Sequence, residues 1–194
     1  MNDLTVFPTC FDGVVLLYPK TFCDYRGFFR ETYNATKLVQ HGMRTGRFVQ
    51  DNHSRSQYGV LRGLHYQVKF PQTKLVSCIH GEIYDVVVDI RTDSPTFGQY
   101  AGFTLSEVSQ DQLLVPAGFA HGFIVKSEHA DVMYKCTDYY HPEDDGGILW
   151  SDPDLNIPWN NAAPILSSKD AIYPCLKDID KDKLPKIHPV IGPF

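Results

Sequence analysis

The chain has 194 residues, of which 43% are hydrophobic, and it carries a formal net charge of −5 at pH 7, a profile typical of a folded globular protein rather than a disordered or fibrous one. The negative charge argues against nucleic acid as the main partner, and no run approaches the roughly 20 apolar residues that a membrane-spanning helix needs. The N-terminus has no basic region before an apolar stretch, so we expect no secretory signal and a cytoplasmic location.

Short apolar runs rich in valine, isoleucine and aromatic residues, separated by glycine and proline, predict strands rather than helices. The predicted strands are Gly13–Tyr18, Leu75–Ile79, Ile83–Asp89, Tyr100–Leu105, Gln112–Val115, Gly122–Val125 and Asp131–Thr137. Helical patterns occur only near Ala35–His41, which Asn34 can cap, and around Ser168–Tyr173. Many short strands with little helix favour an antiparallel sandwich or jelly roll.

The stretch from Ile83 to Asp89 alternates in a way that indicates a binding cavity. One face of this predicted strand is wholly apolar, and the other carries Asp85 and Asp89. A partly polar interior face is typical of a barrel that encloses a ligand site. We expect one domain over residues 1–194, with a core at about 7–173 and a peripheral tail over 174–194, where prolines mix with alternating Asp and Lys.

The most specific motifs follow a polar run from Gln50 to Ser56. Residues 59–67 read G-V-L-R-G-L-H-Y-Q, which resembles the signature of the dTDP-4-dehydrorhamnose 3,5-epimerase family. Further segments match in the family's order: D-Y-R-G-F-F-R-E at 24–31, Q-T-K-L-V at 72–76, D-V-V-V-D-I-R at 85–91, S-P-T-F-G at 94–98, P-A-G-F-A-H-G-F at 116–123, Y-K-C-T-D-Y-Y at 134–140 and S-S-K-D at 167–170. The resemblance covers about residues 7–173, nearly the whole chain.

This resemblance implies a fold, a partner and a reaction. The fold is an all-β, cupin-type jelly-roll barrel or sandwich with a few short helices, and the chain forms a homodimer in which N-terminal strands are exchanged. The reaction inverts C3 and C5 of dTDP-4-dehydro-6-deoxy-D-glucose to give dTDP-4-dehydro-L-rhamnose, without a cofactor. The motifs leave open an epimerase of a single centre, or of another nucleotide-linked 4-keto sugar in a rarer deoxysugar pathway.

The resemblance assigns the general base to His65, oriented by Asp170, and the general acid to Tyr134. Hydrogens next to the C4 carbonyl can be removed by a base if the resulting enolate is stabilised. Histidine, with an ordinary pKa of about 6.5, accepts protons near neutral pH, whereas tyrosine, at about 10, stays protonated until the enolate forms. Without the resemblance, a structural role is the favoured interpretation of His65, while Tyr134 is consistent with ordinary core and Asp170 with a surface cap or ion pair.

The resemblance also implies a set of substrate contacts. A diphosphate requires cations and a nucleobase requires an aromatic surface, for which Phe29 and Tyr140 are expected. The implied contacts are Arg26, Phe29, Glu31, Gln50, Asn52, Arg62, Lys74, His121, Tyr140, Asp145 and Lys169, with Arg62 and Lys74 facing the enolate oxygen or phosphate. The family commonly has a glutamate where this chain has Asp145, which leaves that contact open.

Metal chemistry is not expected. Metal-binding cupins carry a paired H-x-H motif, but the equivalent residues here are His65, Tyr66 and Gln67. The five cysteines include no C-x-x-C pair, so free thiols are expected. Two alternatives from other classes stay open, a metal-dependent cupin oxygenase or isomerase and a cupin that only binds. Metal analysis tests the first, and the joint presence of His65, Tyr134 and Asp170 argues against the second.

Overall fold

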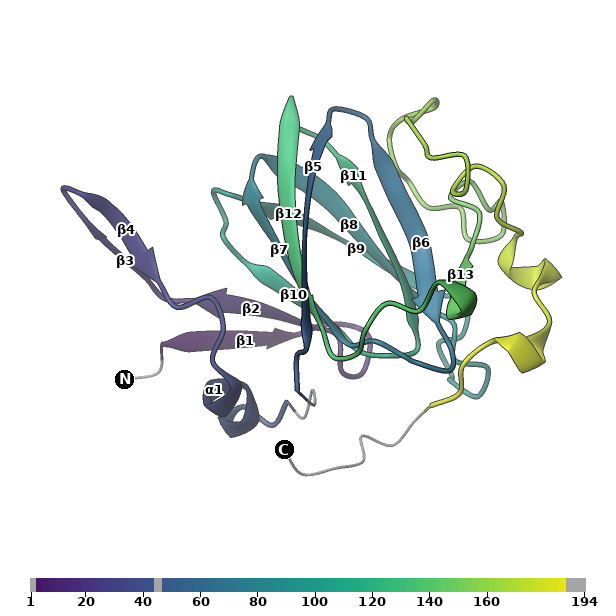
Figure 1. The fold of residues 1–194 in the computed structure, drawn as a ribbon, viewed down its shortest axis with the longest axis horizontal. Helices are drawn as coiled ribbons and strands as arrows, with labels where there is room; N and C mark the ends of the chain where they lie inside the picture. Colours follow the sequence, from purple (N-terminus) through teal and green to yellow (C-terminus); the bar gives the residue numbers. More distant parts are fainter. Residues whose placement is uncertain (1–2, 44–46, 188–194) are drawn as a thin grey trace.

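The computed structural model describes residues 3–43 and 47–187, and it consists mainly of antiparallel strands (Figure 1). The strands are β1 (Leu4–Pro8), β2 (Val15–Pro19), β3 (Thr21–Asp24), β4 (Gly27–Arg30), β5 (Gln50–Gln57), β6 (Leu61–Gln67), β7 (Lys74–His80), β8 (Glu82–Asp89), β9 (Tyr100–Ser106), β10 (Gln112–Val115), β11 (Phe119–Val125), β12 (His129–Cys136) and β13 (Asp145–Gly147). The helices are α1 (Ala35–Gln40) and three 3-10 turns at Pro142–Asp144, Leu176–Asp178 and Lys181–Lys183.

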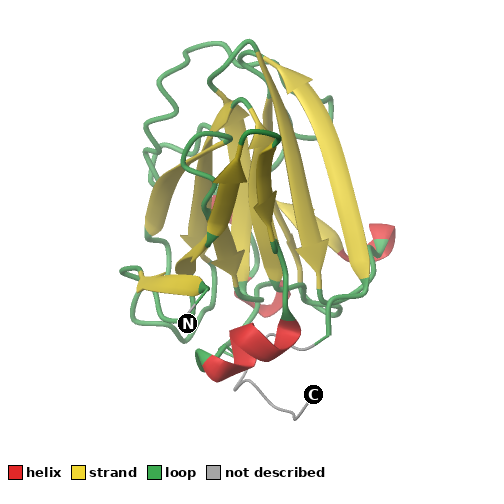
Figure 2. Ribbon diagram, turned by 90° about the vertical axis from the view of Figure 1, so that its left-hand side faces the viewer, coloured by secondary structure: helices red, strands yellow, loops and turns green. Residues whose placement is uncertain are grey.

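Two sheets pack face to face and form the body of the molecule (Figure 2). The six-stranded sheet has the order β1-β2-β10-β7-β12-β5, and the five-stranded sheet has the order β13-β6-β11-β8-β9. Strands β3 and β4 form a separate hairpin that projects from the body (Figure 1). This architecture confirms the expected all-β jelly roll.

The space between the sheets is apolar at one end and polar at the other. Inward side chains of both sheets form an apolar cluster that includes Val76, Val87 and Phe123. Strand β5 has a different inward face: Ser56, which is buried, shares that face with Gln50 and Asn52, while the intervening residues are exposed. Because side chains alternate along a strand, β5 supplies a row of polar groups to the interior.

Parts of the outer faces of both sheets are covered as well. The outer face of the five-stranded sheet packs against the C-terminal segment, which buries Leu176 and Leu184 there. The described part of the predicted tail, residues 174–187, therefore lies over the sheet and completes a core cluster, and residues 188–194 lie outside the described residues. Helix α1 covers part of the six-stranded sheet with Leu38. Asn34 caps this helix as predicted, because its side chain accepts a hydrogen bond from the Lys37 amide.

All seven predicted strands occur, with bounds shifted by a few residues, but one helical prediction is wrong. Residues 168–172 form turns rather than a helix. The Ser167 carbonyl accepts a hydrogen bond from the Ala171 amide, as in a first helical turn, but Pro174 follows before a second turn can form. Within the described part of the chain, no helix combines the length and apolarity needed to cross a bilayer.

Candidate active site

A cavity of about 320 Å³ opens into the polar end of the interior, between the two sheets. Gln50 and Asn52 reach it from β5, and Tyr134 from β12 of the same sheet. His65 reaches it from β6 of the opposite sheet. The structure thus gathers seven of the predicted site residues around one space: Gln50, Asn52, His65, Lys74, Tyr134, Tyr140 and Asp145.

His65 and Asp170 form the predicted pair although 105 positions separate them in sequence. The Nε2 atom of His65 lies 2.6 Å from Oδ1 of Asp170, and the carboxylate is only 6% exposed. The carboxylate accepts a hydrogen bond from the Nε2–H group of His65. The other ring nitrogen, Nδ1, then carries no proton and has a free lone pair. Burial by itself would raise the pKa of Asp170, but the hydrogen bond and charge of His65, with Ser167 and Lys169, hold that pKa below its ordinary value.

A tyrosine that the sequence did not single out flanks this pair. Gly147 of β13 is the cross-strand neighbour of His65 and has no side chain, and the ring of Tyr173 occupies the space a side chain there would fill. The Tyr173 ring stands edge-on to the imidazole, with ring centroids 5.9 Å apart. Burial, and then the charge of Asp170, raise the pKa of Tyr173. Only the glycine on β13 signals this packing, and the sequence cannot show what fills the space.

Tyr134 is placed opposite His65, on β12 of the other sheet. Burial and the neighbouring Cys136 raise the pKa of its phenol, and the positive charge of Arg62 opposes that shift. The phenol is therefore protonated at neutral pH, as a proton donor must be. Arg62 is held by a hydrogen bond of 3.1 Å from its Nε to the Ser56 hydroxyl and does not line the cavity.

Lys74 is the cation that reaches the cavity at the start of β7. Burial lowers the pKa of its amine, and the nearby Cys136 and Asp85 oppose that shift. A cation in a poorly hydrated space interacts strongly with any negative charge that develops beside it.

His121 lies next to His65 across strands β6 and β11, but it is paired elsewhere. Its Nε2 atom lies 2.9 and 3.0 Å from the two carboxylate oxygens of Asp85, and both side chains are buried. The polar face predicted for β8 thus gives His121 a partner inside the barrel. Because Nε2 is engaged, the expected contact of His121 with diphosphate can be made only by its Nδ1 atom.

Lys169 and Asp145 are brought together as a direct ion pair at the cavity rim. The Asp145 carboxylate is 9% exposed and the Lys169 amine about half exposed. Lys169 therefore faces a carboxylate of its own chain as well as any substrate phosphate.

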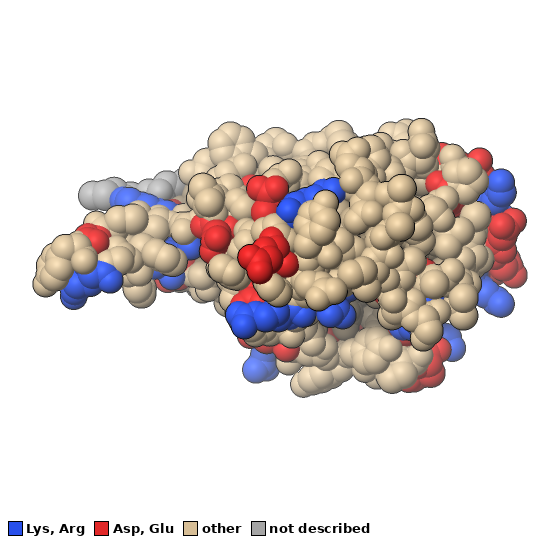
Figure 3. All heavy atoms as spheres, turned by 90° about the horizontal axis from the view of Figure 1, so that it is seen from above, with Lys and Arg blue, Asp and Glu red and all other residues tan. Residues whose placement is uncertain are grey.

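Three predicted contacts lie away from this cavity. Arg26 and Phe29 belong to the projecting hairpin, where Phe29 is 70% exposed and Arg26 pairs with Asp24. Glu31 follows the hairpin and pairs with Lys37. Seen from above, the hairpin extends well beyond the body, and most of its surface is neither acidic nor basic (Figure 3).

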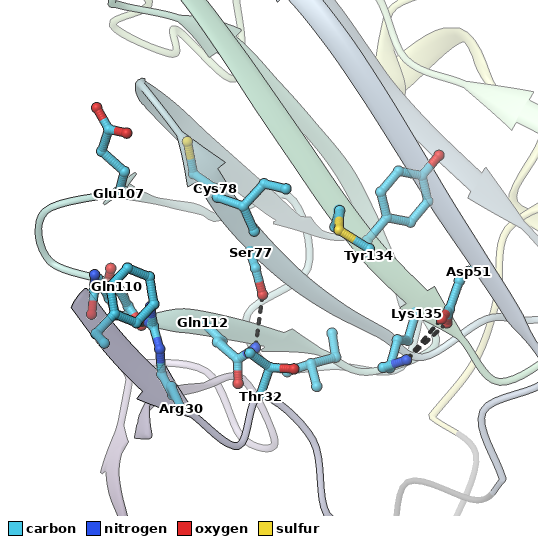
Figure 4. A pocket seen from close by; sticks show the side chains of 15 residues that line it. Arg30, Thr32, Asp51, Ser77, Cys78, Glu107, Gln110, Gln112, Tyr134 and Lys135 are labelled. Atoms are coloured by element: carbon cyan, nitrogen blue, oxygen red, sulfur yellow. Dashed lines mark hydrogen bonds and ion pairs between the residues drawn. The ribbon is translucent and has the colours of Figure 1, made fainter. Parts of the chain in front are cut away.

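A second cavity, of about 330 Å³, lies on the outer face of the six-stranded sheet. Its lining mixes apolar side chains, such as Phe28, Leu75 and Met133, with polar and charged ones, such as Arg30 and Glu107. Figure 4 shows that Tyr134, although it borders this cavity, points its hydroxyl away from it. The Tyr134 hydroxyl therefore belongs to the interior cavity, which Tyr134 also lines.

The chain is similar to dTDP-4-dehydrorhamnose 3,5-epimerases over most of its length. Residues 8–178 match the family model described as dTDP-4-dehydrorhamnose 3,5-epimerase. The dTDP-4-dehydrorhamnose 3,5-epimerase of Pseudomonas aeruginosa is 50% identical over 168 residues, which are 86% of this chain and 93% of that protein.

Solved structures agree with the sequence matches. A dTDP-6-deoxy-D-glucose-3,5-epimerase of Legionella pneumophila, in complex with dTDP-4-keto-L-rhamnose, is 49% identical, covers 96% of this chain and 100% of its own, and superposes with a TM-score of 0.93. The dTDP-4-dehydrorhamnose 3,5-epimerase of Bacillus anthracis, with TDP and PPi bound, is 50% identical, covers 89% of this chain and 99% of its own, and gives a TM-score of 0.86.

Proposed function

Because the chain belongs to the dTDP-4-dehydrorhamnose 3,5-epimerase family, we propose that it inverts C3 and C5 of dTDP-4-dehydro-6-deoxy-D-glucose and releases dTDP-4-dehydro-L-rhamnose. The observation that carries this proposal is the placement of His65 and Tyr134 on opposite sheets around one cavity. Inversion of a carbon requires removal of a proton from one face and delivery to the other.

His65 is the proposed base at both carbons. With Nε2 engaged by Asp170, the lone pair of Nδ1 takes the proton from the carbon next to the keto group. The electron pair left behind moves into the carbonyl and forms an enolate. As His65 becomes an imidazolium, the buried carboxylate of Asp170 stabilises its charge.

Lys74 and Arg62 are proposed to stabilise the enolate oxygen. Lys74 lines the cavity, whereas Arg62 is an exposed residue outside it whose positive charge acts on Tyr134. Tyr134 then donates its hydroxyl proton to the opposite face of the carbon, and exchange with water removes the proton from His65 and reprotonates Tyr134 before the second carbon reacts. The raised pKa of this phenol favours the protonated form until the electron-rich enolate is present. The sequence of steps needs no metal or cofactor.

The nucleotide is proposed to bind at the mouth of the cavity. Tyr140, about half exposed there, offers an aromatic surface for the thymine, and Gln50 and Asn52 offer amide groups beside it. Lys169 is proposed to contact the diphosphate, sharing its charge with Asp145. His121 and Asp145 complete the proposed contacts.

A homodimer is the proposed assembly. The projecting hairpin exposes four large aromatic side chains, Phe22, Tyr25, Phe28 and Phe29, and the outer sheet face beside it exposes Ile79 and Met133. Such a surface is more apolar than a monomer normally presents to water. In a dimer, Arg26, Phe29 and Glu31 would reach the site of the second copy. Sedimentation analysis should give about twice the chain mass of 22.0 kDa, and a species of one chain mass at micromolar concentration would contradict the assembly. A cytoplasmic location is proposed as well.

The reaction is tested by incubating the purified protein with the dTDP-linked 4-keto sugar in deuterated water. Proton NMR should show loss of the signals at both C3 and C5 as deuterium replaces the abstracted hydrogens. Exchange and inversion at one carbon only would identify a single-centre epimerase, and no exchange at either carbon would refute the proposed activity.

A further inference from the structure

The segment that carries Tyr140 is held by side chains instead of by a strand ladder. Beyond β12, the amide of Tyr139 donates to the carboxylate of Asp138 at 2.8 Å. The amide of Tyr140 donates to Oε1 of Gln50 at 3.0 Å, and that of His141 donates to Oε1 of Gln67 at 3.0 Å. Polar backbone groups near a protein interior need partners, so these side chains determine the path of the segment.

A third glutamine binds the same segment from another side. Nε2 of Gln72 donates to the carbonyl oxygen of Asp138 at 2.9 Å. The three glutamines come from β5, from β6 and from the loop before β7, and all of them line the interior cavity. We call Gln50, Gln67 and Gln72 the glutamine clamp.

Gln67 does more than hold one amide. Its Nε2 donates to the carbonyl oxygen of Phe70 at 2.8 Å, and the Phe70 ring stacks on the ring of His141 with centroids 3.7 Å apart. One buried side chain therefore ties together the two loops whose rings stack beside Tyr140. Because each glutamine amide has both a donor and an acceptor, it can bind two backbone groups at once.

We propose that Gln67 and Gln72, with Gln50, are positioning residues that fix Tyr140 at the cavity mouth in the orientation that receives the nucleobase. An aromatic surface that is ordered before binding loses less conformational entropy when the ligand arrives. The clamp acts on ligand affinity and leaves the proton-transfer groups His65 and Tyr134 untouched. This proposal rests on the proposed function, because it takes Tyr140 as a nucleotide contact.

The test uses the full chain with Gln67→Leu and Gln72→Ala, and with Gln57→Leu as control. Gln57 is an exposed residue at the end of β5, outside the cavity. Hydrogen exchange of the 138–141 backbone amides is followed in the ligand-free protein. Dissociation constants for dTDP, and KM and kcat for the 4-keto sugar, are then measured on the same samples.

We expect faster exchange of the 138–141 amides in both clamp variants, and a dTDP dissociation constant and a KM raised by about five- to tenfold, as one lost hydrogen bond implies. The value of kcat should stay within about twofold, because the lost interaction is made before and during the chemical step alike. Gln72→Ala, which alters a half-buried side chain, supplies the test if Gln67→Leu does not fold.

Three outcomes would refute the proposed positioning role of the glutamine clamp. Unchanged exchange with weaker dTDP binding would mean that the glutamines contact the nucleotide directly. Faster exchange with unchanged dTDP binding would mean that the segment need not be fixed. A fall in kcat with KM unchanged would place the residues in the chemistry. The exchange measurement needs no substrate, so failure of the proposed activity itself would be visible separately, as absent turnover in the parent protein.

Discussion

Asp170→Asn removes a negative charge from the partner of His65 with almost no change in shape. The two side chains meet at 2.6 Å, and the carboxylate is nearly excluded from water. Hydrogen bonds to charged groups contribute about 1.5–3 kcal/mol. If that stabilisation is realised when His65 becomes an imidazolium, kcat/KM should fall by about 10- to 150-fold.

The loss should appear in kcat rather than in KM. An asparagine that presents its NH2 group to Nε2 requires the proton on Nδ1 instead, and His65 then faces the substrate without its lone pair. Steady-state kinetics of Asp170→Asn would be compared with those of Asp154→Asn, a control in an exposed ion pair with Lys177. A folded Asp170→Asn protein with kcat within about threefold of the parent would refute the orienting role of Asp170.

The pairing of Asp170 with His65 should also make the stability of the fold depend on pH. The pKa of Asp170 in the folded chain lies below the ordinary aspartate value of about 3.9, so the pair stabilises the fold fully above that value and loses this contribution as pH falls through the lowered pKa. Urea unfolding between pH 5 and pH 3 should therefore show a smaller decline in Asp170→Asn than in the parent. Parallel declines would show that the pair does not contribute to the pH dependence of stability.

Three further predictions concern separate features. In Gly147→Ala the new Cβ would lie 2.3 Å from the Tyr173 ring, so Tyr173 must move away from His65. Because this disturbs the surroundings of the base, kcat/KM should fall by about tenfold or more. A variant with the same kcat/KM as the parent protein would contradict this. Asp89→Ala leaves Arg91 buried without its partner and should lower the free energy of unfolding by about 3–5 kcal/mol in urea titrations, whereas a loss below about 1 kcal/mol would count against it. Activity should survive exhaustive EDTA treatment, because the described residues contain no group of three His, Cys, Asp or Glu side chains suited to a metal; loss restored by added metal would refute this.

Strands such as β8 and β12 could be predicted from sequence because their runs of valine and other apolar residues lie between turn residues. Strand β5 could not be predicted in this way. Its inward face is polar and its outward face is polar or charged, so the sequence lacks the alternation of apolar and polar residues that marks a half-buried strand. Gln50 and Asn52 of β5 line the interior cavity, so the pattern that hides this strand is also the one that builds the cavity.

The candidate site and the pairing of His65 with Asp170 were accessible through the family motifs, but the pairing of His121 with Asp85 was not. The separation of His65 and Asp170 along the chain gives no local signal of their contact, and the same holds for His121 and Asp85. The turn of residues 168–172 looked helical because its spacing fits one helical turn, yet Pro174 prevents a second. These outcomes depend on which strands pair, and strand pairing is set by the whole fold.

His65 is proposed to remove the protons and Tyr134 to return protons from the opposite face. This assignment is tested most directly by NMR in deuterated water with His65→Asn and Tyr134→Phe. His65→Asn should incorporate no deuterium at C3 or C5, whereas Tyr134→Phe should still exchange but invert poorly, each with a rate loss on the order of 10² to 10⁴. Normal inversion in Tyr134→Phe together with persistent exchange in His65→Asn would contradict both assignments.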